Sequence, residues 1–388
     1  MKRIAIALAL TLAAAPALRA ADAWFVSPDA GLGIFGPVTF KAHVETTEVV
    51  ESVEFFVDGR SIGLVTAEPW ELLYDVGYEN QEHRLRLVAT LATGERVEAT
   101  RETASFKVDD ELDIELRQLY VNVMSEGRRV TDLGRERFRI FDGGNAETIV
   151  TFEHGDIPMT AVLLLDCSGS MEGDRLDAAL SGASTFLSRM APLDEAKLML
   201  FSDRLLGSTP FTRDQTVLEQ ALSSVAADGG TAINDYLFAS LKMLDGRQGR
   251  RVIVLFTDGA DLHSLLRMRD VLWKAQRSQA VLYWIYLKEP GESGQPSFNT
   301  SWRDHEENQE EYKLLRRAVT ESGGHIAELE SIRDLEGAFG EIIDELRNQY
   351  VLGYYPQNSR RDGSWRDVDV RVRRLGARVR TRQGYIDD

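Results

Sequence analysis

The chain has 388 residues, of which 43% are hydrophobic and 28% are charged, as is typical of globular proteins. At about 100–200 residues per domain, this length suggests two or three domains. The formal net charge of −17 makes nucleic acid and anionic lipid surfaces poor candidates for partners, because both repel an acidic protein.

The first twenty residues have the pattern of a secretory signal peptide. Lys2 and Arg3 precede an apolar run at residues 4–15, and several alanines follow. This run is shorter than the roughly 20 residues that a helix needs to span a bilayer. We therefore expect residues 1–20 to be cleaved and the protein to be exported, with no transmembrane segment left. An uncleaved membrane anchor is the alternative interpretation.

Cys167 is the single cysteine of the chain. Disulfides within the chain therefore cannot hold the fold together, which excludes a disulfide-stapled extracellular module. An export signal without disulfides indicates a bacterial protein of the periplasm, the cell surface or the medium.

Residues 24–108 are predicted to form an all-β domain. Asp58-Gly59 and Thr93-Gly94 each separate two β-prone runs, which is typical of short hairpins. The segment, which includes VEFFVDG at 53–59, resembles bacterial immunoglobulin-like modules, and this implies a β-sandwich that serves as a spacer or a binding module. The aromatic residues expected to fill its core are Trp24, Phe55, Phe56, Trp70 and Tyr74.

Residues 109–156 are predicted to be a connector of short strands that packs on the next domain, because so short a segment forms only a marginal core. Residues 351–388 are predicted to be a β extension, since parts of it alternate apolar and polar residues. Its stretch 358–382 holds nine arginines and three aspartates. A solvated sheet face is the simplest interpretation, and contact with an anionic partner or with the chain's own acidic loop at 288–311 is the alternative.

Between these segments, residues 157–350 show apolar strand patterns that alternate with helical ones. The run TAVLLLD, which ends at Asp166, is continuously apolar, as expected for a strand that is covered on both faces. The alternation predicts an α/β domain with a doubly wound, mostly parallel sheet and helices on both faces, similar to a Rossmann fold. Such sheets bind ligands at the carboxyl ends of their strands.

Polar residues directly follow the first of these strands, at 166–170, and three chemistries are compatible with that turn. A nucleophile, either Cys167 or a serine, would need a nearby base, but the six histidines are scattered and the pattern G-x-S-x-G is absent. Phosphoryl transfer usually requires a second acid where this chain has Ser168, and no phosphate-binding G-x-x-x-x-G-K-(S/T) loop is present. The third alternative is a metal site built from oxygen ligands.

The metal alternative gains support from two later turns that would lie on the same rim of the sheet. A threonine follows Gly229-Gly230 at the start of a helix, and an aspartate ends the strand pattern VLFTD. Together with the turn at 166–170, they supply two carboxylates and three hydroxyls, which are hard donors that suit Mg²⁺, Ca²⁺ or Mn²⁺. The five candidate ligands are Asp166, Ser168, Ser170, Thr231 and Asp258.

These residues resemble a known motif. D-x-S-G-S at 166–170, Thr231 in GGTAIND and Asp258 in FTDG are similar to the metal-ion-dependent adhesion site of von Willebrand factor type A domains. The flanking segments resemble exported bacterial proteins called VWFA-related, which are abundant in Acidobacteria. The resemblance implies Mg²⁺, or alternatively Mn²⁺ or Ca²⁺, and a partner protein whose acidic residue completes the coordination. Asp235 has two interpretations. It either supports the direct ligands without contacting the metal, or it is an ordinary acid at the start of a helix, where the helix dipole favours negative charge.

From the sequence we therefore expect an exported, non-enzymatic protein that binds a partner carboxylate through a divalent metal. One alternative is a structural scaffold whose metal site is vestigial or only stabilising. A metal-dependent or cysteine-dependent hydrolase is a less favoured alternative.

Overall fold

The computed structural model describes residues 21–34, 36–77, 79, 81–105, 116–155, 157–223, 225–258, 261–288, 305–357 and 359–388. The predicted signal peptide and most of the acidic loop at 288–311 lie outside these residues. The chain divides into two compact units, which we describe separately. In the described part of the chain, none of the helices has the length and apolar character needed to cross a membrane.

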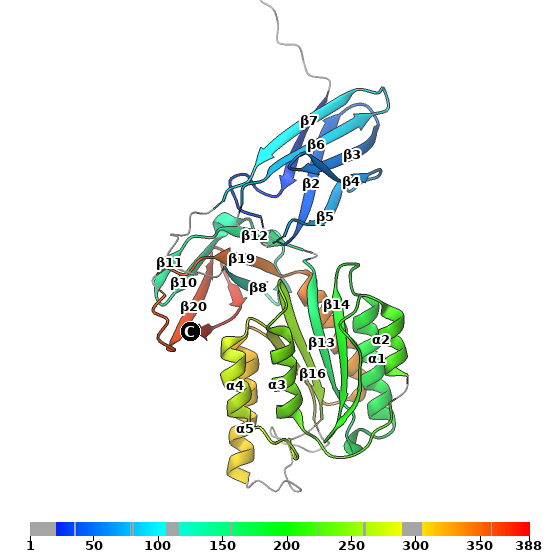
Figure 1. The fold of residues 1–388 in the computed structure, drawn as a ribbon, viewed down its shortest axis with the longest axis vertical. Helices are drawn as coiled ribbons and strands as arrows, with labels where there is room; N and C mark the ends of the chain where they lie inside the picture. Colours follow the sequence, from blue (N-terminus) through cyan, green and yellow to red (C-terminus); the bar gives the residue numbers. More distant parts are fainter. Residues whose placement is uncertain are drawn as a thin grey trace, which may run out of the picture. The chain divides into compact units, whose positions relative to one another are not determined.

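The first unit consists of two antiparallel sheets (Figure 1). The ring of Phe55 in one sheet lies 6.3 Å from that of Phe25 and 6.1 Å from that of Phe40 in the other, so the sheets pack face to face. Their strand orders are β1-β2-β5 and β4-β3-β6-β7. The strands are β1 (Ala21–Ser27), β2 (Pro37–Thr46), β3 (Val50–Val57), β4 (Arg60–Val65), β5 (Glu71–Asp75), β6 (Arg84–Leu91) and β7 (Arg96–Glu102).

Both predicted hairpins of this unit are confirmed, since β3 pairs with β4 and β6 with β7. The predicted core is only partly correct. Phe55 and Trp70 are buried, but Trp24 and Tyr74 are 39% and 38% exposed. In β1 the residues that alternate with Trp24 face inward, so Trp24 faces outward and packs on His43, with 4.5 Å between the ring centroids. Large aromatic side chains on a strand therefore did not identify its buried face.

The second unit contains a six-stranded sheet in the order β15-β14-β13-β16-β17-β18. All neighbouring strands are parallel except β15, which is antiparallel to β14. This is the predicted doubly wound arrangement, in which the chain proceeds outward in both directions from the central strands β13 and β16. The strands are β13 (Met159–Asp166), β14 (Glu195–Phe201), β15 (Leu205–Ser208), β16 (Arg250–Thr257), β17 (Val281–Leu287) and β18 (Ile326–Leu329).

Helices cover both faces of this sheet (Figure 1). Leu163 and Leu165 pack in the core beneath α1, α2 and α6, whereas Val162 and Leu164 pack in the core beneath α3, α4 and α5. The alternation explains why β13 is buried at every position and apolar at all but Thr160 and the terminal Asp166. The helices are α1 (Asp174–Ser188), α2 (Gln215–Leu222), α3 (Ile233–Leu244), α4 (Met268–Arg277), α5 (His305–Glu321) and α6 (Leu335–Arg347), with short 3₁₀ turns η1 (Arg135–Arg137), η2 (Gly169–Met171) and η3 (Ile332–Asp334).

The segments before and after the α/β layer combine into one two-sheet β module with its own core. Sequence interpretation treated them as separate, but β8 pairs with β19 and β21, and β10 pairs with β20. The strand orders are β12-β19-β8-β21, with β9 beside β8, and β11-β10-β20-β22. The strands are β8 (Arg117–Ser125), β9 (Arg128–Arg129), β10 (Phe138–Asp142), β11 (Asn145–Glu147), β12 (Thr151–His154), β19 (Tyr350–Tyr354), β20 (Trp365–Val372), β21 (Ala377–Arg380) and β22 (Gly384–Ile386).

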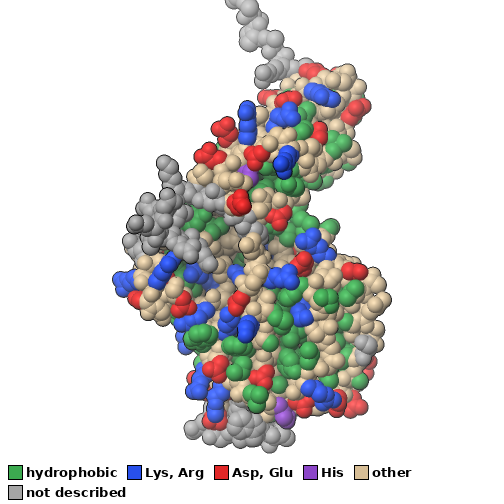
Figure 2. Space-filling view, viewed as in Figure 1, with side chains coloured by type: hydrophobic (Ala, Val, Ile, Leu, Met, Phe, Trp, Pro, Cys, Tyr) green, Lys and Arg blue, Asp and Glu red, His purple; other side chains and the backbone are tan. Residues whose placement is uncertain are grey.

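Most of the arginines at 358–382 are exposed, as expected for a solvated sheet face, but two of the nine are buried. Arg366 is 9% and Arg382 is 8% exposed. Arg366 Nε donates to Asp142 Oδ1 at 2.7 Å, and its Nη1 lies 3.3 Å from Asp387 Oδ2. On the face shown in Figure 2, basic and acidic side chains are interspersed. Part of this positive charge is therefore taken up inside the protein.

The carboxylate of Asp142 holds the second sheet of the β module together from a fully buried position. It accepts hydrogen bonds from Arg366, from Tyr354 Oη at 2.9 Å and from Tyr385 Oη at 2.8 Å. We expect Asp142→Ala to lower the free energy of unfolding by about 3–5 kcal/mol, because it leaves a buried guanidinium without its main partner. Urea unfolding followed by circular dichroism measures this loss.

The matched control is Asp369→Ala in the same module. The Asp369 carboxylate pairs with Arg371 at 2.7 Å, but both side chains are more than half exposed. This substitution is expected to change stability by less than about 1 kcal/mol. Equal losses for the two variants would contradict the structural role of Asp142.

Candidate metal centre

The five predicted ligands lie near the carboxyl ends of β13 and β16, where the winding of the sheet changes direction. Asp166 is the last residue of β13, and Asp258 directly follows β16. The two strands are parallel, with Leu165 opposite Phe256, so Asp166 lies beside Thr257. Thr257 Oγ1 donates to Asp166 Oδ2 at 2.6 Å. This switch point is where open α/β sheets bind their ligands.

The turn after β13 folds back toward Asp258. Ser168 N donates to Asp166 Oδ1 at 2.9 Å, and Ser168 then begins the 3₁₀ turn η2. The hydroxyls of Ser168 and Ser170 lie 3.2 Å apart, and Ser170 Oγ donates to Asp258 Oδ1 at 3.0 Å. Hydrogen bonds thus connect four of the five predicted ligands.

The fifth residue, Thr231, approaches the cluster through its backbone neighbours. Gly169 N donates to Gly229 O at 2.9 Å, which joins the two loops. Gly229 has φ +82, and a Cβ there would lie 2.4 Å from Asp203 Oδ1; a Cβ on Gly230 would lie 2.1 Å from the ring of His263. The glycine pair therefore allows the loop to pass close to its neighbours. Thr231 is 5% exposed. Its carbonyl accepts hydrogen bonds from Leu262 N and His263 N at 2.9 Å, and its N donates to His263 Nδ1 at 3.3 Å.

Two acidic side chains of the centre are almost completely buried. Asp166 is 0% and Asp258 is 4% exposed. Burial, and secondarily the negative charge of Asp258, raises the pKa of Asp166 to about 7. Two buried carboxylates with mutual repulsion are costly unless a cation lies near them.

An arginine from the next helix supplies positive charge that sequence reasoning did not anticipate. Arg175, in the first turn of α1, places Nη1 2.8 Å from Asp258 Oδ2, and the two side chains are 27% and 3% exposed. Its position five residues after Ser170 was a sequence signal, because an arginine in the first turn after a polar loop can reach back over that loop. Thr257 was also missed, although it directly precedes Asp258.

The residues present fit a small divalent cation. The donors are two carboxylates and three hydroxyls, all of them hard oxygens. Within the described residues, no three His, Cys, Asp or Glu side chains are grouped as a metal site, so a cation at this centre would take hydroxyl ligands besides Asp166 and Asp258. The buried acid pair provides the negative charge that such a cation would neutralise.

Asp235, in the first turn of α3, contacts the loop that follows β16. Its carboxylate accepts hydrogen bonds from Leu265 N at 3.0 Å and from Leu266 N at 2.8 Å. Its own backbone N donates to Ser264 Oγ at 3.1 Å. Asp235 therefore anchors the loop that follows β16. Within that loop Leu265 is 94% exposed, so a large apolar side chain is presented by a tethered backbone.

The position of Cys167 disfavours its use as a nucleophile. It is fully buried in the core beneath α1 and α6, and its Sγ lies 3.5 Å from Leu165 O. Burial, and secondarily the charge of Asp166, raises the pKa of the thiol to about 12. The thiol is therefore protonated at neutral pH, which disfavours its use as a nucleophile.

Comparison with known proteins identifies two domain types. Residues 161–260 match the family model of the von Willebrand factor type A domain, and residues 23–87 match that of a bacterial Ig domain. A curated relative, the uncharacterized protein sll0103 of Synechocystis sp. (strain ATCC 27184 / PCC 6803 / Kazusa), is 30% identical over 111 residues. The match covers 28% of this chain and 26% of the relative, so the chain matches about a quarter of that protein's length.

Solved structures with detectable similarity include two bacterial proteins. The conserved hypothetical protein BatB from Bacteroides thetaiotaomicron is 18% identical, with a TM-score of 0.38, over 49% of this chain and 100% of that one. The von Willebrand factor type A protein from Catenulispora acidiphila is 12% identical, with a TM-score of 0.40, over 71% of this chain and 74% of that one.

The anchoring role of Asp235 predicts a local effect of its removal. Asp235→Ala should accelerate hydrogen exchange at the amides of Leu265 and Leu266, because both lose their acceptor. Hydrogen–deuterium exchange measured by mass spectrometry tests this. Asp177→Ala, which removes an exposed acid from the first turn of α1, is the control and should leave this loop unchanged. Unchanged exchange at the loop in Asp235→Ala would contradict the assignment.

Proposed function

We propose that this chain is an exported, non-enzymatic interaction module that binds a carboxylate of a partner protein through a divalent metal. Asp166, Ser168, Ser170, Thr231 and Asp258 hold the metal, which is Mg²⁺ or, alternatively, Mn²⁺ or Ca²⁺. The match of residues 161–260 to the von Willebrand factor type A family model supports a role in protein–protein interaction or adhesion. The narrower kinship with exported VWFA-related proteins of Acidobacteria type is part of this proposal.

One observation carries the proposal: two buried carboxylates at the ends of neighbouring strands are connected through the backbone N of Ser168 and the hydroxyls of Ser168 and Ser170, at the switch point of the sheet. A divalent cation would neutralise both Asp166 and Asp258. With hydroxyls as the remaining protein ligands, an octahedral ion keeps exchangeable positions. An acidic side chain from outside can take such a position, and this binding needs neither a base nor a nucleophile.

The surroundings of the centre also favour binding over catalysis. The thiol of Cys167 is buried and protonated. His263, the histidine beside Thr231, uses Nδ1 to accept a hydrogen bond from Thr231 N at 3.3 Å. The exposed Leu265 on the anchored loop offers apolar surface to a partner near the same end of the sheet.

The ion pair of Arg175 with Asp258 favours a second candidate, a structural scaffold whose metal site is vestigial. In this alternative, the guanidinium permanently supplies the positive charge that a metal would otherwise provide. Metal titration of the wild type and of an Arg175 variant separates the two functions.

The first experiment is calorimetric titration of the purified chain with MgCl₂ and with MnCl₂. The wild type should bind at least one of these ions with a Kd in the millimolar range or tighter. Asp166→Ala should weaken binding by more than about 100-fold, because even the loss of a partner behind a direct ligand costs about 10–100-fold. Asp177→Ala is the control and should bind as the wild type does. Absence of binding to the wild type would refute the metal-dependent function.

The partner is tested by immobilising the chain and exposing it to an extract of exported proteins with Mg²⁺ or with a chelator. A specific partner should bind only with Mg²⁺, return when Mg²⁺ is restored, and fail to bind Asp166→Ala. Binding that is indifferent to both the chelator and the substitution would contradict carboxylate capture through the metal.

A further prediction concerns Arg175, which would compete with the metal for the carboxylate of Asp258. Arg175→Gln should tighten Mg²⁺ binding by about tenfold, because the ion no longer displaces a partly buried guanidinium, and tenfold corresponds to about 1.4 kcal/mol. Arg175→Lys keeps the charge and should remain closer to the wild type. Arg189→Gln, which removes an exposed arginine paired with Asp344, is the control and should have no effect. If neither the wild type nor Arg175→Gln binds metal, the scaffold alternative holds.

A further inference from the structure

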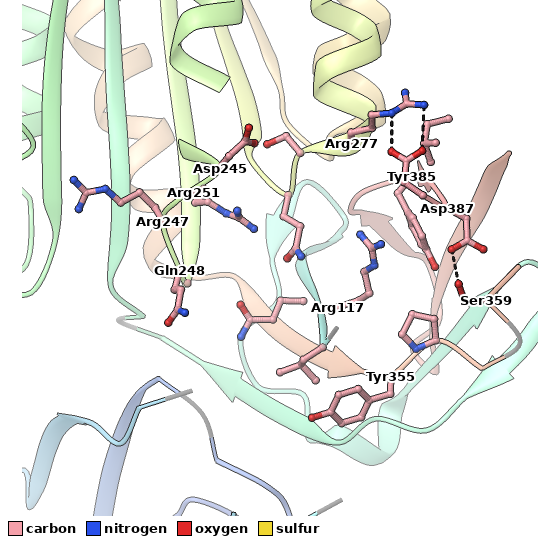
Figure 3. Close-up of a pocket in the computed structure, with 18 of the residues that line it drawn as sticks. Arg117, Asp245, Arg247, Gln248, Arg251, Arg277, Tyr355, Ser359, Tyr385 and Asp387 are labelled. Carbon is pink, nitrogen blue, oxygen red and sulfur yellow. Dashed lines mark hydrogen bonds and ion pairs between the residues drawn. The ribbon is translucent and has the colours of Figure 1, made fainter. Parts of the chain in front are cut away.

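A cavity of about 880 Å³ lies within the second unit, between the α/β layer and the β module (Figure 3). On one side, its walls come from the loops before β16 and β17, including residues 245–249 and 277–279, and from Arg251 in β16. On the other side, they come from the start of β8, the segment after β19, and β22. The amino ends of the parallel strands therefore border the cavity, whereas the candidate metal centre lies at their carboxyl ends. Arg251 and Thr257 are six residues apart in β16, which separates the two sites by roughly 20 Å.

Each of the three acidic side chains in the described lining of this cavity has a basic partner. Asp387 accepts hydrogen bonds from Ser359 Oγ at 2.7 Å and from Arg360 N at 2.8 Å, and it also pairs with Arg366. Asp388 lies 2.7 Å from Arg277. The third acid of the lining, Asp245, pairs with Lys274. These carboxylates are therefore already neutralised.

Two lining arginines lack such partners. In the described part of the chain, neither Arg117 nor Arg251 forms an ion pair, and Arg251 Nε is buried without a hydrogen-bond acceptor. The guanidinium carbon of Arg117 lies 3.9 Å from the ring centroid of Tyr385. Figure 3 shows the guanidinium groups of both arginines directed toward the open centre of the cavity.

The positive charges of Arg117 and Arg251 also act on a third arginine, Arg382. Arg382 is 8% exposed and donates to backbone carbonyls, among them Ala280 O at 2.9 Å. Burial, followed by the charges of Arg117 and Arg251, lowers the pKa of Arg382 to about 10. Three like charges near one cavity are unfavourable in isolation, and an anion would relieve their repulsion.

We propose that this cavity binds a small organic anion that carries phosphate or carboxylate groups. Arg117 and Arg251 bind the anionic group, because the planar guanidinium matches both oxyanions with paired N–H donors. The volume lies within the range of about 300–1,000 Å³ of small-molecule sites. Tyr355 and Tyr385 contribute aromatic surface for the rest of the ligand, and the amides of Gln248 and Gln279 contribute further polar groups.

This site is independent of the proposed metal centre. On a chain with a formal net charge of −17, two guanidinium groups that form no ion pair with any described residue make this cavity locally attractive to anions. It lies between two layers of the same compact unit. A ligand bound there contacts both the α/β layer and the β module, and it should therefore stabilise the unit against unfolding.

The test is calorimetric titration of the purified full chain in metal-free buffer at constant ionic strength, with inorganic pyrophosphate and with citrate as separate probes. At least one probe should bind with a Kd below about 1 mM. The probe that binds more tightly shows whether the cavity prefers phosphate or carboxylate groups. Asp166→Ala should bind the probes as the wild type does, which separates this result from any failure of the metal centre.

Arg117→Gln and Arg251→Gln should each weaken binding of the preferred probe at least tenfold. Arg373→Gln, which removes an exposed arginine outside the cavity, should leave it unchanged. Circular dichroism establishes that each variant is folded, and Arg117→Gln decides the outcome if Arg251→Gln is unfolded. A Kd above about 1 mM for both probes, or an equal loss in Arg373→Gln, would overturn the proposal.

Discussion

The burial of the Asp166 carboxylate at the end of the central strand constrains the rest of the α/β layer. A carboxylate at this depth requires hydrogen-bond donors and positive charge nearby. Thr257 and the backbone of Ser168 supply the donors, and Arg175 lies on the neighbouring Asp258. The turn after β13, the end of β16 and the start of α1 therefore converge on one point. The glycine pair before Thr231 allows a further loop to approach it.

The local features of this centre were predictable from sequence, because they depend on neighbouring residues. A continuously apolar strand must end at the rim of its sheet, and the polar turns after β13 and β16 must then share that rim. The positions of Asp166, Ser168, Ser170 and Asp258 follow from this argument. The side-chain bonds of Asp235 did not, because its carboxylate reaches amides about 30 residues further along the chain.

The features that sequence could not predict depend on long-range pairing. Alternation in residues 351–388 indicated strands but not their partners, and the stretch around β8 gave no sign that it would pair with β19 and β21. The burial of Arg366 depends on Asp142, which lies 224 residues earlier. The arginine count predicted a solvated face, which holds for most of these side chains but not for the buried Arg366 and Arg382. In the first unit, outward-facing Trp24 shows the same limit at shorter range, because residue type did not reveal which face of the strand is buried.

The pairing of β8–β12 with β19–β22 also has a consequence for how the chain is synthesised. The α/β layer is inserted between the two halves of the β module, so the first half emerges from the ribosome about 200 residues before its partners. Pairing of strands that are far apart in the sequence is slow and costly in entropy, whereas the α/β layer can form from contacts within its own sequence. The β module is therefore completed last, and until then β8 and β10 expose unpaired edges that can pair with other chains. Pairing with β19–β22 closes these edges, so completion of the β module is also the step that protects the protein from aggregation.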